Sequence, residues 1–145
     1  MATRKTARKA TTKPTPQAER ARLARNKKLV LAFYQKMIGD KDPEGARRYM
    51  GSPYIQHSAY ARDGFEGVAE FARQFKRDFP NHRYEVKKVI AEGDLVVLHL
   101  LGINGLSPHG EQVVDIFRVR DGKVVEHWDV IQPLPETSNN PNGHF

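Results

Sequence analysis

The chain contains no cysteine among its 145 residues. This absence excludes a disulfide framework, a zinc site built on thiolates and a cysteine nucleophile. No apolar run approaches the roughly 18 residues needed to span a bilayer, and the N-terminus lacks the apolar stretch of a secretory signal. We therefore expect a soluble, cytoplasmic protein.

Acidic residues are scarce only at the N-terminus. The net charge is +7, but residues 1–28 hold ten Lys/Arg and a single acid, Glu19, whereas the rest of the chain holds 14 basic and 16 acidic residues. The folded part is thus nearly neutral, and the overall basicity does not indicate nucleic-acid binding by it. We interpret residues 1–20 as a disordered basic tail and expect nonspecific polyanion contact through residues 1–28. An organelle transit peptide is an alternative for the same residues.

Three helices are predicted in the first half of the chain. Residues 18–38 carry apolar side chains at intervals of three, four and seven. Asp42 followed by Pro43 is a typical start for a second, short helix. Residues 65–79 form the clearest helix, with a stripe of phenylalanines that we expect to pack against a sheet as core.

After residue 82 the apolar period changes to two, which indicates β-strands. The predicted strands are residues 83–91, 94–102, 112–120 and 123–132. Residues 53–57 are predicted as a loop or a short strand.

Helices followed by consecutive strands predict an α+β fold: a cone-shaped, curved antiparallel or mixed sheet wrapped around about three N-terminal helices. The open end of such a cone is a natural place for a small ligand. We expect the domain to span residues 21–135, followed by an irregular C-terminal tail over residues 136–145.

Two carboxylates interrupt apolar strands. Asp115 lies among Val, Ile and Phe in residues 113–117, and Asp129 follows His127-Trp128 in the next strand. A charged group in such a position costs desolvation unless it has a partner, and groups of this kind often perform acid/base chemistry. The alternative is that the strands have a wet face on which Asp129 simply lies.

The turn between these two strands decides which residues meet. A two-residue turn, Asp121-Gly122, places Asp115 opposite Trp128 and sends Asp129 to the other face. A three-residue turn places Asp115 opposite His127, with Asp129 on their face.

Three stretches resemble the SnoaL-like polyketide cyclase family. They are Gly110–Val113 with Asp121–Asp129, Tyr54–His57, and Ala91–Val97, and the resemblance runs from roughly residue 25 to residue 135. It implies the cone-shaped fold shared with nuclear transport factor 2, ketosteroid isomerase and limonene epoxide hydrolase.

The resemblance also implies roles for residues. In the cyclases, an Asp two residues after the hairpin's His is the general acid/base of an intramolecular aldol condensation, and that role falls on Asp129. The cyclases carry a histidine where this chain has Asp115, so the residue that assists the catalytic Asp has changed in type and charge. Because the resemblance needs Asp115 and Asp129 on one pocket-facing side, we expect the three-residue turn.

The sequence thus predicts a SnoaL-like enzyme performing cofactor-free acid/base chemistry on a small apolar carbonyl compound, by aldol-type cyclisation or isomerisation. The candidate catalytic residues are Asp129, Asp115 and His127. The candidate substrate-binding residues are Gln56, His57, His99, Phe117 and Trp128. A homodimer formed through the outer face of the sheet is expected, with no cofactor.

Three alternatives stay open. One is a non-catalytic ligand-binding or dimerisation module of the same fold, and another is a nucleic-acid-associated protein acting through its tail. The third is a zinc or iron site built from His and Asp, which we favour less because the sequence has no closely spaced pair of histidines. No glycine-rich nucleotide motif and no serine elbow is present.

Overall fold

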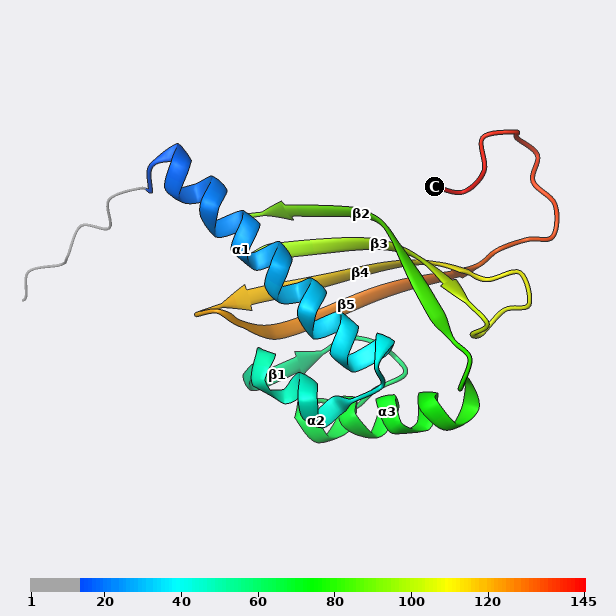
Figure 1. The fold of residues 1–145 in the computed structure, drawn as a ribbon, viewed down its shortest axis with the longest axis horizontal. Coiled ribbons are helices and arrows are strands. Elements are labelled where there is room, and N and C mark those ends of the chain that lie inside the picture. The colour runs from blue at the N-terminus through cyan, green and yellow to red at the C-terminus, as the bar shows by residue number, and fades with distance from the viewer. Residues whose placement is uncertain (1–13) are drawn as a thin grey trace, which may run out of the picture.

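The computed structural model describes residues 14–145, in which a long N-terminal helix crosses the concave side of a curved sheet and a second long helix lies along one edge of it (Figure 1). The helices are α1 (Pro16–Tyr34), the π-helical turn η1 (Gln35–Gly39), α2 (Pro43–Ala46), the 3₁₀ turn η2 (Arg47–Tyr49) and α3 (Gly64–Asp78). The strands are β1 (Met50–Gln56), β2 (Arg83–Glu92), β3 (Leu95–Ile103), β4 (Glu111–Arg120) and β5 (Lys123–Pro133).

The first helix begins earlier than the sequence pattern suggests. Thr15 caps it by accepting a hydrogen bond from the Ala18 N–H (3.2 Å), and Pro16 occupies the first helical position. Residues 16–20, assigned to the tail from composition, are therefore helical. Residues 1–13 of the predicted tail lie outside the described residues.

The sheet has the strand order β1-β5-β4-β3-β2, in which β1 runs parallel to β5 and every other pair is antiparallel. The predicted α+β class, with a curved mixed sheet around N-terminal helices, is confirmed. Residues 53–57, left open as loop or strand, lie mostly in β1.

The β4–β5 hairpin adopts neither of the two registers considered. Asp121 and Gly122, both with positive φ (50° and 70°), form a two-residue turn that pairs Val119 with Val124. A bulge at Val125 then shifts the register, so that Asp115 lies directly opposite Asp129. The prediction of a three-residue turn was wrong. The bulge nevertheless has the consequence expected of that turn, because both carboxylates lie on one face of the sheet.

The two faces of the sheet differ in their neighbours. The inner face packs on α1 through fully buried residues such as Leu98 and Leu100, which meet Val30 and Met37 in the core. The outer face carries half-buried and exposed apolar residues, among them Val130, which is 66% exposed. No helix within residues 14–145 is long and apolar enough to cross a membrane.

Candidate active site

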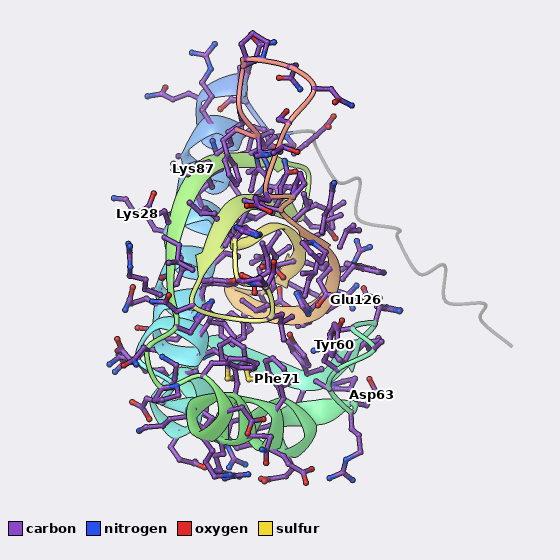
Figure 2. All side chains as sticks on the ribbon, turned by 90° about the vertical axis from the view of Figure 1, so that its right-hand side faces the viewer. Lys28, Tyr60, Asp63, Phe71, Lys87 and Glu126 are labelled. Carbon is purple, nitrogen blue, oxygen red and sulfur yellow. The ribbon has the colours of Figure 1, made fainter. Side chains whose placement is uncertain are left out.

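A cavity of about 300 Å³ lies between α3 and the inner face of the sheet. Phe71, Phe75 and Phe79 of α3 form one wall of it, and Figure 2 shows Phe71 rising from α3 toward the strands. The phenylalanine stripe, expected to be core, is thus partly a cavity wall, while the buried residues on α3 are the smaller Gly67, Val68, Ala69 and Ala72. The cavity has the size and apolar lining typical of small-molecule sites.

Asp129 brings a carboxylate to the wall of this cavity. Asp115 and His127 lie behind it, exposed by only 4% and 9%, and one ligand atom from each of the three residues falls within 4.8 Å of the others. Two carboxylates directly opposite each other on neighbouring strands repel. His127, at hydrogen-bond distance from Asp115, lies close to both carboxylates.

His127 is held at both ring nitrogens. Its Nε2 lies 2.8 Å from Asp115 Oδ1 and its Nδ1 lies 2.8 Å from Gln56 Oε1. Gln56 Oε1 also accepts a hydrogen bond from the Ser58 N–H (2.9 Å), which identifies that atom as the amide oxygen. Nδ1 must therefore donate, and a further proton lies in the hydrogen bond between Nε2 and Asp115.

Tyr34 of α1 is a further polar residue close to Asp115. Burial raises its pKa well above the usual value, and the nearby Asp115 carboxylate raises it further. The phenol consequently stays protonated, and Tyr34 lines the cavity wall. Phe117 stacks on the His127 ring with a centroid distance of 4.6 Å.

None of the five predicted substrate-binding residues lines the cavity. His57, His99 and Trp128 lie on the outer side of the sheet and do not line the cavity, because the strand alternation that turns Asp129 inward turns Trp128 outward. His57 stacks on Trp128 (4.8 Å, interplanar angle 2°) and bonds Glu126, while His99 contacts Gln112. Gln56 and Phe117 contact His127 rather than the cavity.

Glu111, which the sequence analysis did not single out, and His82 also line the cavity. Glu111 is 3% exposed, and burial lowers the pKa of His82 to about 4, with Lys41 contributing in the same direction. The alternation of side chains along β4 could have identified Glu111 as a cavity residue, because residues 111, 113 and 115 must share one face of the strand.

Asp115, His127 and Asp129 are also a set of groups that could hold a metal ion. The donor types suit zinc or iron, and Gln56 would hold His127 with Nε2 toward the ion. As they lie, however, Nε2 and Asp115 Oδ1 are at hydrogen-bond distance (2.8 Å). The geometry is that of a hydrogen-bonded pair beside a second carboxylate.

A cone-shaped α+β fold with a carboxylate at an apolar cavity defines a class of proteins rather than one protein. The model of the SnoaL-like polyketide cyclase family matches residues 28–136. This chain therefore belongs to the SnoaL-like polyketide cyclase family. None of the curated proteins matches the chain.

Solved structures show the same fold. A putative hydroxylase, AclR, from Streptomyces galilaeus is 26% identical over 76% of this chain and 90% of its own, with a TM-score of 0.62. A putative polyketide cyclase from Bacillus cereus is 21% identical over 87% of this chain and 90% of its own, with a TM-score of 0.67. IdmH, a putative polyketide cyclase from Streptomyces antibioticus, is 21% identical over 73% and 91% of the two chains (TM-score 0.59).

Proposed function

We propose that this protein is an enzyme that moves a proton at the carbon next to a carbonyl group, in an aldol-type cyclisation or an isomerisation, without a cofactor. The observation that carries the proposal is the Asp129 carboxylate on the wall of an otherwise largely apolar cavity, with a hydrogen-bonded His127–Asp115 pair behind it. Membership in the cyclase family supports the same chemistry.

Asp129 would be the base. Its carboxylate lines the cavity among mainly apolar side chains, where it can reach the α-carbon of a bound ketone. It would accept the proton from the carbon, and the protonated acid would then deliver it to the new alkoxide in a cyclisation or to another carbon in an isomerisation. The net reaction needs no oxidant or co-reactant.

Tyr34 would hold the developing enolate oxygen. Its hydroxyl stays protonated because burial and Asp115 both disfavour the phenolate, so it can donate a hydrogen bond to an oxyanion formed in the cavity. His127 and Asp115 would act through Asp129 as positioning residues, because their hydrogen bond holds a proton close to the Asp129 carboxylate.

The test uses 1-tetralone, a bicyclic ketone of suitable size, as a probe. Exchange of its α-protons in D₂O is followed by NMR with the wild-type protein and with Asp129→Asn. We expect the wild-type protein to accelerate exchange and the variant to lose about 100-fold or more of that acceleration, the usual contribution of a general base.

Asp121→Asn is the matched control. It makes the same change in the same hairpin, at a turn position with positive φ that asparagine tolerates, and it should leave exchange unchanged. If 1-tetralone binds but exchange is no faster than in buffer, the acid/base proposal is wrong for such ketones and the ligand-binding module is favoured. If added Zn²⁺ or Fe²⁺ is needed for exchange, the metal alternative is favoured.

Two interactions beyond the small molecule remain proposals. A homodimer would form through the apolar outer face of the sheet, and the basic N-terminal residues 1–28 would contact polyanions without specificity. The cytoplasmic location also stays a prediction from the sequence.

A further inference from the structure

One part of the chain holds a surplus of positive charge that the proposed proton transfer does not use. Residues 1–28 and the β4–β5 turn, residues 120–123, together hold 12 of the 24 Lys/Arg and only 2 of the 17 Asp/Glu. The rest of the chain is weakly acidic, with 12 basic and 15 acidic residues. Charge of one sign that is concentrated in this way attracts a polyanion.

The first half of α1 gives this charge a defined surface. Its exposed charged residues are Arg20, Arg25 and Lys28, which lie on one side of the helix, and Figure 2 shows Lys28 projecting outward from the molecule. Glu19 is the only acid among residues 16–28, and it is bound by Arg22 through two hydrogen bonds (2.6 and 2.9 Å). The other exposed residues of this part of α1 are Pro16, Gln17, Ala18, Ala21 and Ala24.

The β4–β5 turn lies beside this half of α1 and extends the basic surface. A groove of about 470 Å³ separates the two, and its lining includes Arg25 of α1 and Asp121 of the turn. Arg120 and Lys123, on either side of the turn, are both exposed. In Figure 1 the start of α1 and the β4–β5 turn lie at the same end of the molecule, away from α3. The helix and the turn thus form one basic surface, in which Asp121 is the only exposed acid.

The composition of this surface favours one kind of polyanion. The exposed side of α1 over residues 16–28 has no aromatic residue on which unpaired bases could stack, and no large apolar residue that could enter a lipid layer. Its alanines are short enough to let the helix backbone approach a partner closely. Arg20 and Lys28 are about 12 Å apart along the helix axis, a length over which a DNA duplex presents about seven phosphate charges.

From this arrangement we infer that the exposed side of α1 and the β4–β5 turn bind the phosphate backbone of a nucleic-acid duplex. Arg20, Arg25 and Lys28 contact the phosphates, and the binding does not depend on base sequence because phosphate contacts carry no sequence information. This duplex contact gives a partner class to the polyanion contact proposed above, on which it rests. It does not depend on the proton transfer, since none of these residues lines the cavity.

The test measures binding of the full chain to a short fluorescein-labelled DNA duplex by fluorescence anisotropy, over a series of salt concentrations. For the wild-type protein we expect a dissociation constant of about 1–100 μM at physiological salt, the usual range for nonspecific binding. The combined variant Arg20→Gln, Arg25→Gln and Lys28→Gln should bind about tenfold or more weakly. Its slope of log K against log salt concentration should be smaller by about 2.7, since each lost phosphate contact removes about 0.9.

The combined variant Arg73→Gln, Lys76→Gln and Arg77→Gln is the matched control. It removes two arginines and one lysine from exposed positions of α3, so the net charge changes by the same amount at a different place on the molecule. Glutamine is as good a helix former as arginine or lysine, and both variants should therefore fold. We expect the control to bind the duplex within about twofold of the wild-type protein, with the same salt slope.

Equal losses in the two variants would show that net charge alone governs binding, and they would overturn the duplex contact. An unchanged affinity in the α1 variant would overturn it as well, as would tighter binding of the wild-type protein to a single strand or to vesicles of phosphatidylcholine and phosphatidylserine.

Two further measurements separate this contact from the proposed function. A wild-type protein that binds heparin and not the duplex would overturn the duplex contact but not the general polyanion contact. Exchange of the 1-tetralone protons should be the same in both combined variants as in the wild-type protein, whereas Asp129→Asn should keep duplex binding while losing exchange. Loss of duplex binding in Asp129→Asn would contradict the separation of the two sites.

Discussion

Gln56 determines the protonation of one nitrogen of His127. Because its Oε1 accepts from both Ser58 N–H and His127 Nδ1, the Nδ1 proton is fixed and Nε2 is directed at Asp115. From the resemblance, Gln56 was expected to bind the substrate. Its contact with His127 depends on β1 lying beside β5, a pairing between segments 71 residues apart, which no local pattern specifies.

Replacing Gln56 tests this arrangement. Gln56→Leu removes the acceptor for a buried N–H, so we expect the free energy of unfolding to fall by about 1–2 kcal/mol. Gln56→Glu keeps an acceptor at that place and serves as the comparison. Urea unfolding gives the free energies, and ¹⁵N NMR of the imidazole reports whether Nδ1 stays protonated. Equal stability and an unchanged Nδ1 signal in Gln56→Leu would contradict the assigned hydrogen bond.

The β4–β5 hairpin shows what the sequence can predict at the scale of an element. The Asp-Gly dipeptide correctly predicted the position of the turn, and the alternation of apolar residues predicted the two strands. The register depends on the bulge at Val125, which packs over Gly51 of β1 so closely that a Cβ there would lie 2.6 Å from Val125 Cγ1. A bulge set by a neighbouring strand cannot be derived from the hairpin's own residues.

Helix α3 was likewise predicted only in part. Its period was predicted correctly, but the period says which face turns inward and not whether that face meets other side chains or an open space. Comparison of α1 with α3 makes the difference measurable, because each presents a phenylalanine to the interior: Phe33 in the core and Phe75 in the cavity wall.

We predict unequal costs for the same substitution at these two sites. Phe33 is 2% exposed and meets the Phe117 ring edge-on at 5.7 Å, so Phe33→Ala should lower the free energy of unfolding by about 3–5 kcal/mol. Phe75 already borders empty space, and Phe75→Ala should cost only about 1–2 kcal/mol because fewer contacts are lost. Urea titrations of both variants provide the measurement. Equal losses would mean that the cavity wall is packed as tightly as the core.

For the whole molecule, the sequence indicated an apolar outer face because β3 carries apolar residues at successive positions. What it did not indicate is how the C-terminal residues cover part of that face. The Phe145 ring lies 5.1 Å from His99, and Gln112 donates to the His144 carbonyl (2.9 Å), and in Figure 1 the chain after β5 turns back toward the sheet. The part of the face around Val130 stays open.

This open region is where we expect the second subunit of a homodimer. Val130 is 66% exposed and pairs with Val114 on the outer face, so a charge there would be buried unpaired at a contact between two copies. We expect wild-type protein to show twice the chain mass of 16.5 kDa in light scattering at micromolar concentration, and Val130→Asp to show the single mass with little loss of folding. Val86→Asp, on β2 beside α1, is the control and should remain dimeric, because that strand position lies near Leu31 and Gln35 rather than on the outer face. A dimer that survives Val130→Asp would place the contact elsewhere, and a monomeric wild-type protein would remove the dimer altogether.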